Sequence, residues 1–230
     1  MLTEHQKEKF SESLEILSRS NRLVIKGSAG VGKTFLVNEL IKELMKRYGI
    51  FSSSQIYCSA STNKAVGVLK SKVTETVTFI TAHAALKMKR KIHKDGKKTF
   101  EPSFHEKYPP LQGVKLFIID EASMIPVHLL AFIEQYATRF SCVVIYIGDN
   151  KQLNPVGETD SPVFLGRPVI VDKDTYDVVP EKFDYMRKYN NFDAVFIKYP
   201  EVELTEIVRQ KGGNPIIDLS RDLKSIKNKI

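Results

Sequence analysis

Residues 27–34 read GSAGVGKT and fit the pattern G-x-x-x-x-G-K-[ST] of a phosphate-binding loop. A strand-like run at 22–26 precedes them, and helical periodicity follows from Lys33 to just before Gly49. Between a strand and a helix, the backbone N–H groups of such a loop surround a phosphate, and the helix start adds partial positive charge. Lys33 is then placed to reach the β- and γ-phosphates, and Thr34 to bind Mg²⁺. The loop therefore predicts an α/β fold that binds ATP and Mg²⁺.

The remaining apolar runs predict a parallel sheet with helices on both faces. Residues 115–120 and 142–148 each hold a continuous apolar run, which is typical of strands buried on both sides. They alternate with helical patterns, as in α/β proteins. Further strands are expected at 55–60, 77–80 and 202–205, and helices at 3–18, 63–69, 82–88, 127–138 and 215–223. Four prolines interrupt residues 158–200, which are expected to be irregular apart from a helix near 181–189.

Polar side chains follow the two most apolar of these strands. Asp120 stands at the carboxyl end of one strand and is placed to hold Mg²⁺ through water. Glu121 beside it is placed to act as general base for an attacking water molecule. After the other strand, Gln152 is placed either to contact the γ-phosphate or simply to form a turn, and its spacing does not decide between the two.

The composition is that of a globular protein. The chain has 230 residues, of which 42% are hydrophobic and 27% charged, and this excludes a collagen, a disordered tail and a disulfide scaffold. Its apolar runs are far shorter than the roughly 20 residues that span a bilayer, and its start has no signal-peptide pattern. We therefore expect a soluble, cytoplasmic protein without a membrane partner. Cys58 and Cys142 lie in strand-like runs and are expected to be buried free thiols.

Positive charge is concentrated in one segment. Residues 87–98 hold seven basic residues and one acid, so they contribute +6 of the net charge of +8. Two strand-compatible arms flank Asp95-Gly96, which predicts a projecting β-hairpin. Such a hairpin favours contact with a polyanion, with a solvated lysine-rich hairpin as the alternative. Phe100 or Phe104 is placed to stack on a base or, equally, to pack in the core. The basic candidates for phosphate contacts are Lys89, Arg90 and Lys97.

Three motifs together resemble those of superfamily 1 helicases. GSAGVGKT at 27–34, IIDEAS at 118–123 and GDNKQLNPV at 148–156 occur in the order and at the separations of motifs I, II and III. They are most similar to the 5′ to 3′ class, which includes the RecD-like and phage Dda-type enzymes. The resemblance covers nearly the whole chain except 158–200. It implies a RecA-like domain that moves along single-stranded DNA at the expense of ATP, in DNA replication or repair in a bacterial or phage-infected cell.

The resemblance also implies roles for individual residues. LTEHQ at 2–6 resembles the Q motif, so Gln6 would recognise adenine, and LTEIVRQ at 204–210 resembles motif IV, so Arg209 would approach the γ-phosphate. The nucleotide would contact Gly27, Ser28, Ala29, Gly30, Val31, Gly32, Lys33, Thr34 and Phe35. Segments 59–66 and 81–86 resemble motifs Ia and Ib, which line the DNA strand, and supply Thr62, Asn63, Lys64, Thr81 and His83. For His83, a structural role as a partly buried histidine is an equal contender.

Helicases of this family place ATP between two RecA-like domains, and the sequence holds no match to the later motifs. We therefore expect residues 1–230 to form one such domain, with an inserted pin-like hairpin at 87–113, an insertion at 158–200, and a second domain required in cis or in trans. Loss of an arginine supplied in trans can cost roughly 10³ to 10⁵ in rate, so hydrolysis by this chain alone should be weak. The alternatives are a binding module for nucleotide and single strands without turnover, and a phosphate-loop kinase or switch. DNA and RNA both stay open as partners, because no feature reads a 2′-hydroxyl.

Overall fold

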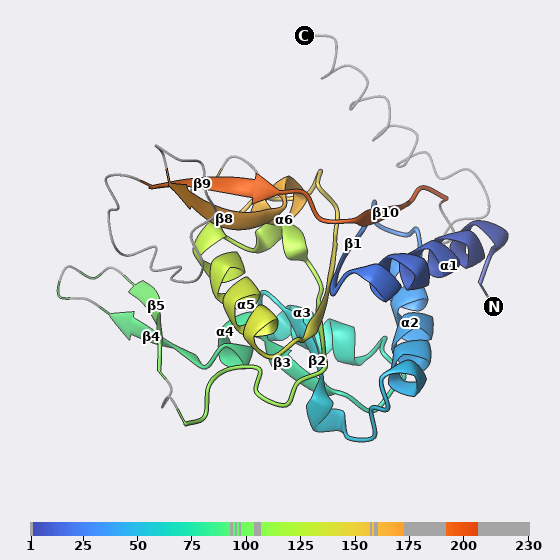
Figure 1. Cartoon of the computed structure of the whole chain (residues 1–230), viewed down its shortest axis with the longest axis horizontal. Coiled ribbons are helices and arrows are strands. Elements are labelled where there is room, and N and C mark those ends of the chain that lie inside the picture. The colour runs from blue at the N-terminus through green and yellow to red at the C-terminus, as the bar shows by residue number, and fades with distance from the viewer. Residues whose placement is uncertain are drawn as a thin grey trace, which may run out of the picture.

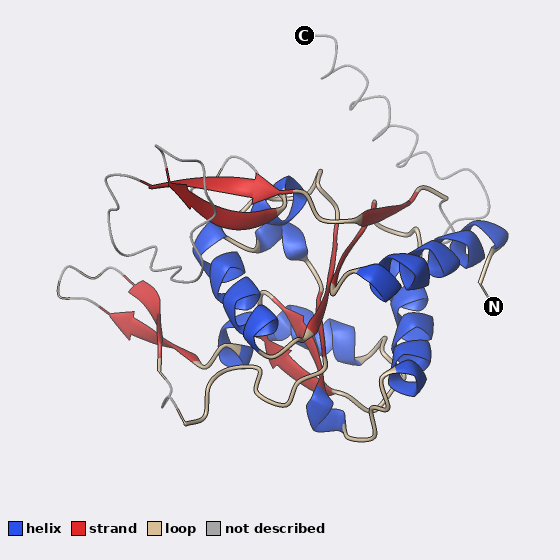
Figure 2. Cartoon of the chain, viewed as in Figure 1, coloured by secondary structure: helices blue, strands red, loops and turns tan. Residues whose placement is uncertain are grey.

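A six-stranded parallel sheet forms the centre of the computed structural model, which describes residues 2–92, 94, 96, 98–103, 107–156, 158, 161–172 and 192–206 (Figures 1 and 2). The strand order is β10-β1-β7-β6-β2-β3, and all five pairings are parallel. Every predicted strand of this sheet is confirmed, with each end within one residue. The strands are β1 (Arg22–Gly27), β2 (Ile56–Ala60), β3 (Thr78–Thr81), β6 (Leu116–Ile119), β7 (Val143–Gly148) and β10 (Glu201–Leu204).

Helices cover both faces of the sheet, as the alternation of patterns predicted. In Figure 1, α1 and α2 lie on one side and α5 on the other. Within the described parts of the chain, no helix is both long and apolar enough to cross a membrane. The α-helices are α1 (Glu4–Arg19), α2 (Lys33–Arg47), α3 (Asn63–Lys70), α4 (Ala82–Ala85), α5 (Val127–Arg139) and α6 (Pro162–Leu165), and short 3₁₀ turns occur at η1 (Ser53–Gln55) and η2 (Ala122–Met124).

Two hydrophobic cores result from the alternation of side chains along the strands. Leu23 and Ile25 of β1 belong to the core that contains the buried leucines of α2, whereas Val24 belongs to the core that contains α5. Full burial of such a side chain contributes about 1.5–3 kcal/mol. Cys58 and Cys142 are buried free thiols, as expected. The phosphate-binding loop is thus held between a strand with both faces buried and a helix with one face buried.

The basic hairpin follows the third strand of the chain and projects from the body (Figure 1). Its arms, β4 (Met88–Ile92) and β5 (Lys98–Pro102), pair antiparallel, and Gly96 has a φ of 79°. The helix predicted at 82–88 is wrong at its end, because α4 stops at Ala85. Lys87 adopts a left-handed φ of 51°, which ends the helix and directs the chain into β4. Met88 is buried while the rest of β4 is exposed, so the apolar residue that suggested a longer helix instead anchors the hairpin.

The irregular segment expected at 158–200 contains regular structure. An antiparallel pair, β8 (Arg167–Asp172) and β9 (Phe192–Ile197), lies beside α5 and α6 (Figure 1). The prolines are compatible with these elements, because Pro162 starts α6 and Pro168 stands in a two-stranded sheet with unpaired edges. The predicted helices at 181–189 and 215–223 lie outside the described residues.

A buried ion pair joins three strand regions to α5. Arg22, the first residue of β1, donates from Nε to both carboxylate oxygens of Glu134 at 2.9 and 3.1 Å. The hydroxyl of Tyr146 in β7 donates to the same carboxylate at 2.6 Å, and that of Tyr199, just before β10, donates at 2.8 Å. The Arg22 guanidinium also donates to the carbonyl of Cys142. This network fixes the strands whose other ends carry the phosphate loop and the predicted motifs III and IV.

Candidate nucleotide site

The phosphate-binding loop leaves β1 at Gly27 and enters α2 at Lys33. A Cβ at Gly27 would lie 2.6 Å from the carbonyl oxygen of Leu204 and 2.8 Å from a methyl group of Val31. Only glycine fits there, because real Cβ atoms do not approach other atoms so closely. Gly32 caps α2 with a left-handed φ of 83°, which glycine adopts without strain. Close packing against β10 therefore sets the position of the loop.

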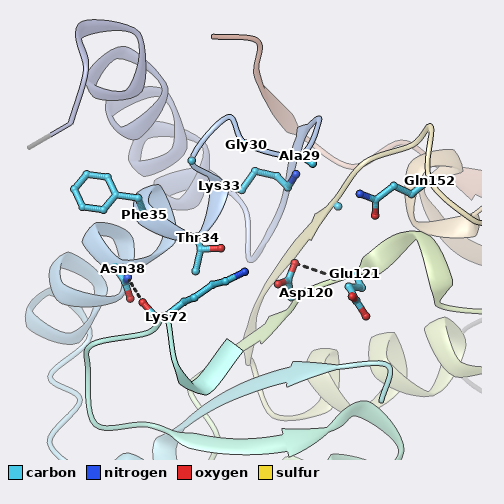
Figure 3. A pocket seen from close by; sticks show the side chains of 12 residues that line it. Ala29, Gly30, Lys33, Thr34, Phe35, Asn38, Lys72, Asp120, Glu121 and Gln152 are labelled. Atoms are coloured by element: carbon cyan, nitrogen blue, oxygen red, sulfur yellow. Dashed lines mark hydrogen bonds between the residues drawn. The ribbon is translucent and has the colours of Figure 1, made fainter. Parts of the chain in front are cut away.

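Predicted residues from three segments line one pocket of about 510 Å³ (Figure 3). Lys33 lies across the loop, and its ammonium donates to the carbonyls of Gly27 and Ser28 at 2.5 and 2.9 Å. Phe35 is 40% exposed at the pocket wall. The predicted residues in the lining are Ala29, Gly30, Gly32, Lys33, Thr34 and Phe35 from the loop and α2, Asp120 and Glu121 after β6, and Gln152 after β7.

The two carboxylates occupy the carboxyl end of β6. Asp120 accepts a hydrogen bond from the backbone N–H of Glu121 at 2.9 Å, and Glu121 adopts a left-handed φ of 55°. Burial raises the pKa of the Asp120 carboxyl, although the Glu121 N–H opposes this rise. Burial also lowers the pKa of the Lys33 ammonium against the attraction of Asp149 and Asp120. Both charges are partly desolvated, so an ion that pairs with either of them is bound more strongly than in water.

The oxygen donors in the pocket fit Mg²⁺. Thr34 offers a hydroxyl and Asp120 a carboxylate in the same lining. Mg²⁺ is usually held by one or two carboxylates together with waters and substrate phosphates. Among the described residues, no three His, Cys, Asp or Glu side chains form a group that could hold a metal ion by themselves.

Several residues of the site were not predicted, although two of them, Ser61 and Asp149, lie within the motif-like segments 59–66 and 148–156. Asn38 and Lys72 line the pocket, and Ser61 donates from its hydroxyl to Oε2 of Glu121 at 3.0 Å. Asp149 is buried and is the carboxylate that acts most strongly on the Lys33 ammonium. Only Asn38 carried a usable signal, because it is a polar residue one helical turn beyond Thr34 on a face that is otherwise apolar.

Gln6 is buried beneath the phosphate loop. Its Nε2 donates to the carbonyl of Val31 at 3.3 Å, and its Oε1 accepts from the backbone N–H of Thr3 at 3.1 Å. The Thr3 hydroxyl in turn accepts from the Gln6 backbone N–H, which completes a capping box at the start of α1. Gln6 therefore contacts the loop from behind, through Val31 of the loop itself, and neither residue lines the pocket. The predicted adenine contact of Gln6 stays a prediction.

The predicted nucleic-acid contacts gather at the carboxyl ends of β2 and β3. Ala60 and Thr81 are register partners, so the segments that follow them start side by side. Thr62 caps α3 and Thr81 caps α4 by accepting a backbone N–H bond from the third residue beyond each. Asn63 and Lys64, in the first turn of α3, are exposed.

The hairpin meets α4 through an aromatic contact. The rings of His83 and Phe100 lie 4.0 Å apart at an angle of 33°, and Phe100 remains 42% exposed. Burial, with a further contribution from His128, lowers the pKa of His83, so its imidazole is held neutral. Lys89 and Arg90 on the neighbouring strand are exposed. The remaining predicted site residues, Lys97, Phe104 and Arg209, lie outside the described residues.

Comparison with known proteins gives a family and several relatives. A family model described as an AAA domain matches residues 11–158. The chain is 32% identical over 154 residues to an uncharacterized protein of Acanthamoeba polyphaga mimivirus, covering 62% of this chain and 31% of that protein. It is 27% identical over 227 residues to the ATP-dependent DNA helicase dda of Enterobacteria phage T4, covering 98% of this chain and 43% of that protein.

A solved structure shares the fold. Bacteroides Pif1 bound to single-stranded DNA is similar with a TM-score of 0.53 and 20% identity, over 95% of this chain and 45% of that one. The RecA-like fold predicted from the sequence is thereby confirmed. The chain spans less than half the length of each of these relatives.

Proposed function

The chain belongs to the AAA domain family, and we propose that it is the first nucleotide-binding half of an ATP-dependent DNA helicase motor. One observation carries the proposal: the phosphate loop, the Asp120–Glu121 pair and Gln152 come from three different strands and line one pocket. The same three segments carry the helicase motifs of the sequence. The likeness to dda favours a helicase over a phosphate-loop kinase or switch.

The residues of the pocket suit the separate tasks of ATP hydrolysis. Lys33 holds the β- and γ-phosphates, and the backbone N–H groups of the loop surround them. Thr34 and Asp120 hold Mg²⁺, which neutralises charge on the phosphate oxygens when it is bound. Glu121 orients and deprotonates the attacking water, and Gln152 contacts the γ-phosphate. The hydroxyl of Ser61 keeps the Glu121 carboxylate in place.

The base of the nucleotide has its own candidates. The exposed ring of Phe35 offers an aromatic surface to adenine at the pocket wall. Gln6 reaches this region only through its bond to Val31, so its recognition of adenine requires its side-chain amide to exchange partners.

The nucleic-acid partner we propose is single-stranded DNA, moved in the 5′ to 3′ sense. Its track runs across the carboxyl ends of β2 and β3, where Thr62 and Thr81 cap the helices that follow these two register-paired strands. The stacked rings of His83 and Phe100 form an aromatic surface at the base of that hairpin. We expect a second RecA-like domain, in cis or in trans, to complete the ATP site together with Arg209.

Binding of a fluorescent single-stranded oligonucleotide, followed by anisotropy as salt is raised, tests the track. Neutralising exposed phosphate contacts should weaken binding and flatten its salt dependence. A Lys89→Ala, Arg90→Ala chain is therefore expected to lose affinity by at least tenfold, whereas Lys42→Ala, on the exposed face of α2, should bind like the wild type. Equal affinity of the hairpin variant and the wild type would refute the track.

A further inference from the structure

Lys72 is a second cation in the nucleotide pocket that no motif of the sequence indicates. It lies in the loop between α3 and β3 and lines the pocket together with Lys33. Figure 3 shows its side chain extending toward Asp120, whereas Lys33 approaches from the phosphate loop. Among the described residues, no carboxylate lies within ion-pair distance of the Lys72 ammonium. The pocket therefore holds a cation that is available to a bound anion.

The backbone of Lys72 is fixed by a buried amide. Asn38, which is 6% exposed, donates from Nδ2 to the carbonyl of Lys72 at 2.8 Å. Its Oδ1 accepts from the backbone N–H of Thr74 at 3.2 Å. Asn38 stands one turn beyond Thr34 on α2, so the helix that starts at the phosphate loop also holds the Lys72 loop. Burial of Leu69 and Val73 on either side secures the loop from the core.

The charged groups near Lys72 indicate which part of a bound nucleotide its ammonium would contact. Its positive charge lowers the pKa of Lys33, after the larger effect of burial and against Asp149 and Asp120. It also opposes the rise in the pKa of Asp120 that burial causes. Lys72 thus acts on the lysine of the phosphate loop and on the carboxylate of the metal site. In a phosphate-loop protein these two groups flank the terminal phosphates of the nucleotide.

We propose that Lys72 contacts the γ-phosphate and makes the site prefer ATP over ADP. The proposal rests on the nucleotide site described above and adds to it a residue that determines specificity. ATP carries one more negative charge than ADP. In the proposed site this charge lies on the terminal phosphate, at the end of the nucleotide that faces Asp120. Two lysines that reach this end from opposite sides favour the nucleotide with the additional phosphate, and Asn38 keeps the second lysine there.

Lys72→Met tests the proposal, because it keeps an unbranched side chain that is only one atom shorter and removes the charge. Affinities for ADP and for a β,γ-imido analogue of ATP are measured with Mg²⁺ by isothermal titration calorimetry. A hydrogen bond to a charged group contributes about 1.5–3 kcal/mol. The variant should therefore bind the ATP analogue at least about tenfold more weakly than the wild type does, whereas its affinity for ADP should fall by less than about threefold. Lys72→Arg should keep the preference for the analogue. Lys70→Met is the matched control, since Lys70 is exposed on α3 and does not line the pocket.

The possible results separate this proposal from the nucleotide site itself. Unchanged affinities in Lys72→Met, or equal losses for both nucleotides, would overturn the role of Lys72 while the wild-type affinity still supports the site. If the wild type binds neither nucleotide, the proposed nucleotide site itself is refuted, and the role of Lys72 is refuted with it. Far-UV circular dichroism of each variant establishes that its fold is intact. Lys72→Arg tests the same position with the positive charge retained.

Discussion

Replacement of Glu134 by alanine should destabilise the fold by about 5–7 kcal/mol. The Glu134 side chain is 1% exposed and its partner Arg22 is 11% exposed, so alanine would leave a guanidinium buried without a counter-charge. Breaking such a pair costs about 3–5 kcal/mol. The hydroxyls of Tyr146 and Tyr199 lose the same acceptor, and each bond contributes about 1 kcal/mol. Because domains are stable by only about 5–15 kcal/mol, the variant should be close to unfolding at 25 °C.

Urea denaturation followed by far-UV circular dichroism measures this loss. Glu134→Gln should lose only slightly less, because an amide oxygen still accepts a hydrogen bond from a tyrosine but no longer neutralises Arg22. Glu15→Ala is the matched control, since Glu15 is 64% exposed and pairs with Arg19 on the surface of α1. That surface pair should contribute no more than about 0.5 kcal/mol. A loss below about 1 kcal/mol in Glu134→Ala would refute the view that this network holds the strands together.

Three further outcomes are expected. Ser61→Ala should lower kcat for ATP hydrolysis about tenfold and leave KM unchanged, because the bond that orients Glu121 is lost while the phosphate contacts remain. Burial raises the pKa of both cysteine thiols to about 12, so Ellman's reagent at pH 8 should react only after denaturant is added. Burial lowers the pKa of His83 and of His128 in the folded chain. As the pH drops below about 6.5, the two imidazoles therefore take up protons more readily in the unfolded chain, and the stability of the fold should decrease. The urea midpoint should therefore be lower at pH 5.5 than at pH 7, and a chain with glutamine at both positions should show a smaller difference.

Each of these outcomes has a contrary result. A Ser61→Ala chain with unchanged kcat would mean that Glu121 needs no orienting partner. Rapid thiol reaction in the native state would contradict the burial of Cys58 and Cys142. Equal midpoints at the two pH values would show that the imidazoles of His83 and His128 are not held neutral by the fold.

Local signals in the sequence were sufficient to predict the strands of the sheet and the residues at the centre of the nucleotide site. The glycines and lysine of 27–34 define a loop geometry by themselves, and β6 and β7 are short apolar runs whose carboxyl ends mark where a site residue must lie. Because the ends of parallel strands meet at one edge of the sheet, the sequence pattern is enough to bring Asp120 and Gln152 into one pocket with the loop.

The residues that were not predicted depend on contacts between distant segments. Lys72 reaches the pocket because Asn38 holds its loop, and at a separation of 34 positions the sequence gives no local sign of that contact. Ser61 meets Glu121 because β2 pairs with β6, which a motif at either strand does not reveal. The strands β8 and β9 escaped prediction for a different reason, since Pro168 suggests a break in a strand, although an edge position needs no backbone donor.

Steady-state phosphate release by the 230-residue chain, with Mg²⁺ and ATP and with or without a single-stranded oligonucleotide, tests the proposed motor function most directly. We predict slow release that the oligonucleotide stimulates and that Lys33→Ala abolishes. Release that is insensitive to both the oligonucleotide and Lys33→Ala would contradict this function. Background release in every sample with ATP bound would equally contradict it, because the chain would then be a binding module without turnover.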